Sequence, residues 1–229
     1  MNNFHYDILL FDADDTILDF KAAEYDGIRS LFSNHNIPTD DATISLYEEI
    51  NHSLWKSFEL GEIKRDEILY KRFALLGKAL NLSVDAHKMD TDYQLELSKG
   101  HKTIHGAKEL LESLKKTHDL YIVTNGVAST QHSRLTASGL LPYFKEIFVS
   151  EAIGYQKPRI EFFDHVFSHI PPFKKDRVLL IGDTLSSDIL GGQNAGIDTC
   201  WYNPHHKESV PSIHCTYEIE SLSDLMALV

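Results

Sequence analysis

The sequence predicts an α/β protein with a doubly wound parallel sheet and a smaller helical domain inserted after the first strand. Short runs of consecutive apolar residues alternate with segments of helical spacing over the second half of the chain. Uninterrupted apolar runs are typical of parallel strands that are buried on both faces. Strands that alternate with helices favour a parallel sheet with right-handed crossovers.

The first apolar run, Ile8–Phe11, predicts the first strand. After it the spacing of apolar residues stays helical to about Gly100, with short breakers between the segments. We expect helices around residues 28–32, 46–58, 68–80 and 93–97. Residues 19–99 are therefore expected to form the helical domain, and residues 1–18 and 100–229 the core domain.

The remaining elements are expected to alternate along the core domain. Strands are expected at residues 120–123, 147–149, 178–181 and 199–202. Helices are expected at residues 107–114, 131–138 and 162–167, and after residue 188.

The composition excludes several classes of function. A formal net charge of −12 over 229 residues argues against binding to a nucleic-acid polymer or to an anionic membrane. No apolar run approaches the length of a membrane span, and residues 1–5 lack a signal-peptide pattern. Two cysteines, Cys200 and Cys215, are too few for a metal knuckle. We therefore expect a cytoplasmic protein with reduced thiols; the sequence does not indicate its oligomeric state.

Polar residues follow the expected strands where those strands end, which is where ligands bind in open α/β sheets. Converging carboxylates repel each other by about 4 kcal/mol per close pair at an intermediate dielectric, so the arrangement requires a cation. An all-oxygen set of ligands favours Mg²⁺ with a phosphate. The candidate residues are Asp12, Asp14, Thr124, Asn125, Lys157, Asp183 and Asp188.

Each partner taken singly also has an ordinary structural role. Thr124 could cap the following helix, and Lys157 could be a solvated loop lysine. Asp188 alone is more often a charge on a helix surface, and His205–His206 a solvated pair rather than half of a metal site. The combination on separate strand ends is what favours a site.

These residues, in this order, resemble the haloacid dehalogenase-like (HAD) superfamily. The resemblance implies a Rossmann-like core with a C1 cap in the position of the helical insertion. It implies that Asp12 is a nucleophile that forms an aspartyl-phosphate, and that Asp14 is the general acid and base. The motifs are 12–16, Thr124, Lys157 and 182–188.

The resemblance also implies ligands for the metal and for the phosphate. The phosphoryl oxygens would be bound by Thr124, Asn125 and Lys157, and Lys157 would also restrain the nucleophile. Mg²⁺ would be bound by Asp12, the backbone carbonyl of Asp14 and Asp183, with Asp188 supporting the metal directly or through water.

Within the superfamily, further residues resemble the pyrimidine 5′-nucleotidase branch called YjjG-like. The resemblance implies hydrolysis of nucleoside 5′-monophosphates, including non-canonical pyrimidine nucleotides. An acid, Asp15, stands where most relatives have glycine, and His105 where they often have proline. The other matching residues include Asn51, Trp55, Gln131, Arg134, Gly139 and Cys200.

Three alternatives to a nucleotidase remain at this point. They are a phosphatase for sugar phosphates or phosphoglycolate, a haloacid dehalogenase, and a phosphate-binding protein without catalysis. Asp14 and the pair Asp183 and Asp188 argue against the dehalogenase. In the cap, Asn51 and Trp55 are expected to contact the nucleoside, or Trp55 to pack between helices. The expected buried stripe beside them is Leu46, Ile50, Leu54 and Phe58.

Overall fold

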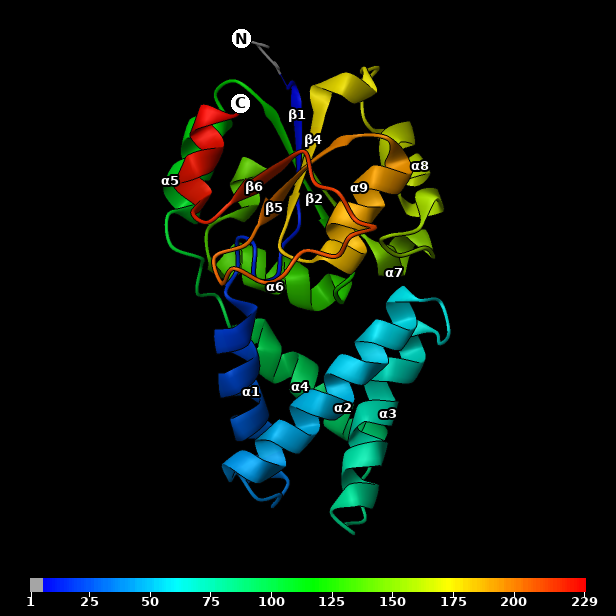
Figure 1. Ribbon diagram of the computed structural model, residues 1–229. Helices are drawn as coiled ribbons and strands as arrows, with labels where there is room; N and C mark the ends of the chain where they lie inside the picture. Colours follow the sequence, from blue (N-terminus) through cyan, green and yellow to red (C-terminus); the bar gives the residue numbers. More distant parts are fainter. Residues whose placement is uncertain (1–5) are drawn as a thin grey trace. The chain divides into compact units, whose positions relative to one another are not determined.

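The computed structural model describes residues 6–229, so residues 1–5, which lack a signal-peptide pattern, lie outside the described part. The chain divides into two compact units (Figure 1). The core unit contains the chain up to Asp19 together with His101–Val229, and the helical unit contains Phe20–Gly100.

The core unit is built on a six-stranded sheet in which every strand pair is parallel. This confirms the predicted α/β class. A sixth strand, β6, was not predicted, because its three residues form no apolar run. In sheet order the strands are β3 (Glu146–Val149), β2 (Asp119–Thr124), β1 (Ile8–Phe11), β4 (Val178–Gly182), β5 (Asp198–Tyr202) and β6 (Tyr217–Ile219).

Strand β1 lies at the point where the winding of the sheet reverses. It pairs with β2 on one side and β4 on the other, with Phe11 level with Ile122 and with Ile181. The next residue, Asp12, donates its backbone N–H to the carbonyl of Ile181 at 2.9 Å. Ligands bind at such a reversal, outside the carboxyl ends of the strands, so the sheet places Asp12 where a site is expected.

Apolar side chains of β1 alternate between two hydrophobic clusters, one on each face of the sheet. Leu9 and Phe11 belong to the cluster with α5 (Ala107–Leu114), whereas Ile8 and Leu10 belong to the cluster with α8 (Ile160–His169). Figure 1 shows α5 and α8 on opposite sides of the sheet. Full burial of each Leu or Phe side chain contributes about 1.5–3 kcal/mol, so the sheet is a rigid base for the loops at its edge. The other core helices are α6 (Ala128–Ala137), α7 (Ser150–Ile153) and α9 (Leu190–Ala195).

The helical unit packs around an aromatic cluster. The ring of Tyr47 stacks on Phe73 with centroids 5.8 Å apart, and meets Phe32 edge to face at 5.9 Å. Two of its helices begin at an aspartate whose side chain accepts a backbone N–H, Asp40 from Thr43 and Asp85 from Lys88. The helices are α1 (Phe20–Asn34), α2 (Asp41–Glu59), α3 (Arg65–Ala79) and α4 (Ala86–Lys99).

The predicted buried stripe on α2 is wrong in part. Phe58 is buried, but the line of buried residues runs through Tyr47 and Asn51. The large Tyr47 ring fills the aromatic cluster, and Asn51 is buried because polar partners surround it, as described below. Three members of the predicted stripe are only partly buried: Leu46, Ile50 and Leu54.

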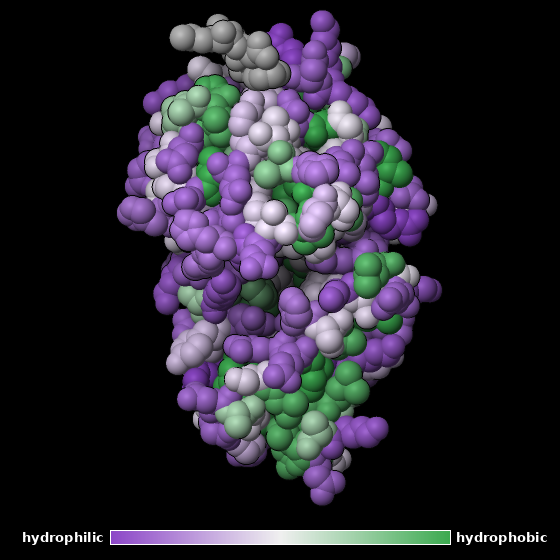
Figure 2. All heavy atoms as spheres, viewed as in Figure 1, coloured by the Kyte–Doolittle hydropathy of each residue, from purple (hydrophilic) through white to green (hydrophobic). Residues whose placement is uncertain are grey.

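Among the described residues, no helix combines the length and apolarity that a bilayer crossing requires. Figure 2 shows mainly hydrophilic residues on the face viewed, with smaller groups of hydrophobic residues between them.

Candidate active site

The segment after β1 turns sharply. Asp12 is only 8% exposed, and the Thr16 hydroxyl donates to Asp12 Oδ2 at 3.4 Å. Asp15 has a φ of 54°, in the left-handed region that aspartate tolerates better than most residues. Its backbone N–H donates to the carbonyl of Leu18 at 2.8 Å, which closes the turn. This conformation explains how an aspartate is accommodated at position 15.

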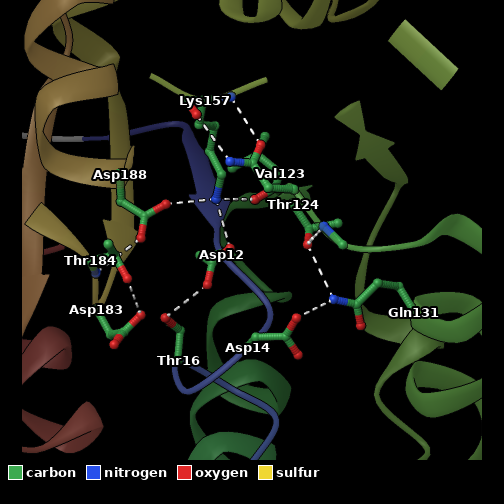
Figure 3. Close-up of polar contacts among 12 residues, drawn as sticks. Asp12, Asp14, Thr16, Val123, Thr124, Gln131, Lys157, Asp183, Thr184 and Asp188 are labelled. Atoms are coloured by element: carbon green, nitrogen blue, oxygen red, sulfur yellow. Dashed lines mark hydrogen bonds and ion pairs between the residues drawn. The ribbon is translucent and has the colours of Figure 1, made fainter. Parts of the chain in front are cut away.

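Lys157 is the cation at the centre of the site (Figure 3). Its Nζ donates to Asp12 Oδ1 at 2.7 Å, to Asp188 Oδ1 at 2.6 Å and to the carbonyl of Val123 at 2.8 Å. The Lys157 side chain is 1% exposed, and these contacts use all three hydrogens of the ammonium group. The alternative of a solvated loop lysine is therefore wrong.

Three carboxylates lie close together at the ends of β1 and β4. One oxygen from each of Asp12, Asp183 and Asp188 lies within 4.8 Å of the other two. Oxygen donors at this spacing fit a hard divalent cation, for which carboxylates are the usual protein ligands. Gly182 makes room for the cluster, because a Cβ there would lie 2.3 Å from Asp188 Cγ. A larger residue at position 182 would displace a candidate ligand.

The electrostatics of the cluster also favour a cation. Burial raises the pKa of Asp12 well above its ordinary value, and the carboxylates of Asp188 and Asp14 add to the rise, while Lys157 opposes it. Burial likewise raises the pKa of Asp188. Burial acts to lower the pKa of Lys157, but Asp12 and Asp188 outweigh it, so that pKa is raised. Lys157 therefore stays charged, and a bound divalent cation would supply the positive charge that the carboxylates still lack.

Asp183 is oriented by several neighbours. The Thr184 hydroxyl donates to Asp183 Oδ1 at 2.9 Å, and Lys207 Nζ donates to Oδ2 at 3.1 Å. The indole N–H of Trp201, on the neighbouring β5, donates to the Asp183 carbonyl at 3.0 Å. Together these contacts fix both the backbone and the carboxylate of Asp183.

Asp14 lies beside the cluster and is held from α6. Its Oδ2 accepts from Gln131 Nε2 at 2.5 Å, and its Oδ1 accepts from Arg134. Gln131 Nε2 also donates to the hydroxyl of Thr124 at 3.2 Å, at the end of β2. Figure 3 shows this chain of contacts from Asp14 through Gln131 to Thr124.

The Asn125 side chain binds the protein rather than projecting freely. Its Nδ2 donates to the carbonyl of Lys157 at 3.0 Å, and its Oδ1 accepts the backbone N–H of Lys157 at 2.9 Å. These two bonds fix the loop that carries Lys157. The sequence predicted a phosphate contact for Asn125, and the structure gives its amide this positioning role.

The two candidates in the helical unit differ from each other. Asn51 is 6% exposed, donates to Glu24 Oε1 at 3.0 Å and accepts from Arg72 at 3.4 Å, so its amide already has internal partners. Trp55 is partly exposed, and its ring meets Phe58 edge to face with centroids 5.7 Å apart. Trp55 is therefore available to a ligand in part, as expected, whereas Asn51 lies in the buried line of α2.

Several residues that contact the site carry no role predicted from the sequence. Gln131 and Arg134 matched the pyrimidine nucleotidase branch, but their contacts with Asp14 span 117 and 120 residues. Lys207 lies in a loop that carried no motif. Its backbone N–H donates to Asn203 Oδ1 at 2.8 Å, which places it near Asp183. Besides that match, the sequence signal for Gln131 and Arg134 was their i, i+3 spacing on one helix.

Comparisons with known proteins agree with this geometry. The family described as haloacid dehalogenase-like hydrolase matches residues 9–202. HAD-hydrolase YfnB of Bacillus subtilis (strain 168) is 50% identical over 96% of this chain and 94% of its own. Its crystal structure, described as bound to magnesium, has a TM-score of 0.94 and 49% identity, and the alignment covers 98% of each chain.

Two further relatives are named as pyrimidine 5′-nucleotidases. PynA of Streptococcus pneumoniae (strain ATCC BAA-255 / R6) is 41% identical over 96% of this chain and 94% of its own. YjjG of Escherichia coli (strain K12) is 32% identical over 98% of each chain. These matches confirm the resemblance that the sequence motifs indicated.

Proposed function

The chain belongs to the haloacid dehalogenase-like hydrolase family, and from that premise we propose that it is a Mg²⁺-dependent phosphomonoesterase acting on pyrimidine nucleoside 5′-monophosphates. The observation that carries the proposal is the buried Asp12 carboxylate, bound by Lys157 and close to Asp183 and Asp188. The names of PynA and YjjG support the substrate class.

Asp12 acts as the nucleophile. Lys157 holds Oδ1, whereas among residues 6–229 Oδ2 has only the long contact to Thr16, so Oδ2 is the oxygen available to attack phosphorus. Attack forms the bond from Asp12 to phosphorus and breaks the bond from phosphorus to the 5′ oxygen. Splitting the hydrolysis in this way replaces one difficult displacement with two easier ones.

Asp14 transfers the protons. As an acid, it protonates the 5′ oxygen as the nucleoside leaves; as a base, it then takes a proton from the water that attacks the aspartyl-phosphate. Water attack breaks the bond from Asp12 to phosphorus, releases phosphate and restores both carboxyl groups. General acid and base catalysis of this kind contributes about 10²–10⁴-fold.

The charges of the phosphoryl group are balanced by the rest of the site. Bound Mg²⁺, held by Asp12, Asp183, Asp188 and the Asp14 carbonyl, would neutralise phosphoryl oxygens and the crowded carboxylates. The magnesium in the YfnB structure supports this assignment. Lys157 supplies a fixed positive charge and restrains Asp12.

The test is hydrolysis of a panel of phosphomonoesters with and without Mg²⁺. We expect release of phosphate from uridine and cytidine 5′-monophosphates at higher kcat/KM than from purine nucleotides, sugar phosphates or phosphoglycolate, and loss of activity in excess chelator. Preference for a sugar phosphate or phosphoglycolate would overturn the substrate class but keep the chemistry. Full activity in chelator would overturn the role of the metal.

For base recognition we retain Trp55 as the candidate contact, because its ring is partly exposed. Trp55→Ala should lower kcat/KM for a pyrimidine nucleotide and spare p-nitrophenyl phosphate, which carries no nucleobase. Parallel losses on both substrates, together with a lower Tm, would instead make Trp55 a packing residue against Phe58.

A further inference from the structure

Helix α6 presents two polar side chains to the site from a buried position. Gln131 is 2% exposed and Arg134 is 1% exposed. Their i, i+3 spacing puts them on one face of the helix, next to each other. Burying an arginine and an amide costs free energy unless each is paired, and both pair with the same residue, Asp14.

The orientation of the Gln131 amide follows from its neighbours. The Asp14 carboxylate only accepts hydrogen bonds and Arg134 only donates them. Nε2 of Gln131 must therefore face Asp14, while Oε1 faces Arg134 at 3.5 Å. Gly126 allows this placement, because a Cβ at residue 126 would lie 2.5 Å from Gln131 Nε2.

The second hydrogen on Gln131 Nε2 connects Asp14 to the end of β2. Thr124 Oγ1 accepts from Gln131 at 3.2 Å and from the backbone N–H of Gly126 at 3.1 Å. These donors occupy both lone pairs of the hydroxyl oxygen, so its own hydrogen is left to donate. Among residues 6–229 no acceptor for that hydrogen is found, and a phosphoryl oxygen would be a suitable one.

From these contacts we infer that Gln131 and Arg134 are positioning residues that fix the Asp14 carboxylate relative to Thr124. The inference rests on the proposed function, in which Asp14 transfers protons and Thr124 binds phosphate. Arg134 restrains one oxygen of Asp14 and Gln131 the other, so the carboxylate can neither rotate nor swing away. Gln131 also turns the Thr124 hydroxyl into a donor.

The consequence is a dependence on the leaving group. An alkoxide such as the 5′ oxygen of a nucleoside needs a proton as it leaves, whereas p-nitrophenolate needs little assistance. Loss of the restraint on Asp14 should therefore slow hydrolysis of the nucleotide more than hydrolysis of p-nitrophenyl phosphate. Small misplacements of a catalytic group cost about 10²-fold, which sets the expected size of the effect.

The experiment compares Gln131→Met and Arg134→Met with the wild-type protein on uridine 5′-monophosphate and p-nitrophenyl phosphate at saturating Mg²⁺. We expect kcat on the nucleotide to fall by about 10²-fold and kcat on p-nitrophenyl phosphate to fall by at most about 10-fold. Arg134→Lys should recover part of the loss. His132→Ala, an exposed position on the same helix, is the matched control and should leave both activities unchanged.

A double variant distinguishes a role of Arg134 through Asp14 from a general loss of structure. Arg134→Met in an Asp14→Asn background should cause no further loss on the nucleotide, because Arg134 acts through Asp14. Equal losses on both substrates in Arg134→Met, or losses that multiply in the double variant, would overturn the inference. Wild-type protein that prefers another alkyl phosphate would overturn only the substrate class, and the same comparison would then be made with that substrate. Absence of any phosphatase activity would overturn both proposals.

Discussion

Two cations buried in different units of the protein, Lys157 and Arg72, have different surroundings. In the core unit, Lys157 donates to two carboxylates, Asp12 and Asp188. In the helical unit, Arg72 pairs with one carboxylate, Asp90, and its guanidinium also lies over aromatic rings. The single positive charge of Lys157 therefore faces two carboxylates, whereas that of Arg72 faces one.

This difference separates a site built for chemistry from one built for structure. The core cluster retains carboxylate oxygens that fit a further cation, and burial raises the pKa of Asp12 there. In the helical unit, Arg72 has its own carboxylate partner, and Asn51 connects it to Glu24. A matched network of this kind fixes helix positions without needing a ligand. Each of the following substitutions tests one side of the comparison.

The largest effect is expected from the nucleophile. Asp12→Asn should reduce phosphatase activity by about 10⁵–10⁶-fold, because removing a covalent nucleophile removes the reaction path. The Tm of the metal-free protein should not fall, since the substitution removes a buried negative charge whose burial outweighs its attraction to Lys157. Steady-state kinetics and thermal unfolding measure the two results. Substantial residual activity would contradict the covalent mechanism.

Of these substitutions, removal of the Lys157 charge should lower the free energy of unfolding the most. Lys157→Met leaves Asp12 and Asp188 buried without their shared partner, and breaking a buried ion pair costs about 3–5 kcal/mol. Urea unfolding of the metal-free protein measures the loss. Mg²⁺ should restore part of it by binding the same carboxylates. A loss below 1 kcal/mol would show that water reaches the cluster.

Loss of Arg72 should lower stability without changing the rate of the chemical step. Arg72→Met leaves Asp90 and Asn51 without a donor and should lower the free energy of unfolding by about 2–3 kcal/mol. The kcat on p-nitrophenyl phosphate should stay within about 2-fold of wild type, since no proton or charge in the proposed mechanism involves Arg72. A large fall in kcat at a temperature where the variant is folded would erase the distinction between the two networks.

The smallest effect is expected at the surface. Lys88 forms an i, i+4 ion pair with Asp92 at 3.0 Å on α4, and its side chain is 63% exposed. Lys88→Ala should change the free energy of unfolding by about 0.3–0.5 kcal/mol, because water screens such pairs. Urea unfolding beside Arg72→Met measures the contrast. A change as large as that of Arg72→Met would mean that burial is not what separates them.

The strands of the sheet were predictable because the signal for each lies in consecutive residues. Runs such as Ile8–Phe11 and residues 178–181 are apolar throughout, so burial on both faces can be read from consecutive residues. Strand β6 was not predicted, because its pairing with β5 decides its conformation. On α2, spacing alone could not distinguish the buried stripe from the adjoining line, because Asn51 is buried through partners on other helices.

The candidate site was predictable only in its acids and its lysine. Strand ends identify Asp12 and Asp183, because the carboxyl edge of a parallel sheet gathers them. The partners of Asp14 depend on how α6 packs on the sheet, over separations of more than 100 residues, and local spacing does not report that. The same limit applies to the side chain of Asn125, which binds the backbone of Lys157.

The Lys157 ammonium group also has a spectroscopic consequence. Protons on surface lysines exchange with water too quickly to be observed by NMR near neutral pH. Those of Lys157 are shielded from solvent, each has an acceptor, and the pKa of the group is raised by Asp12 and Asp188. Its nitrogen-15 resonance should therefore stand apart from the other lysines and shift when a cation or phosphate enters the site. The protein thus contains its own label for occupancy, without any attached probe.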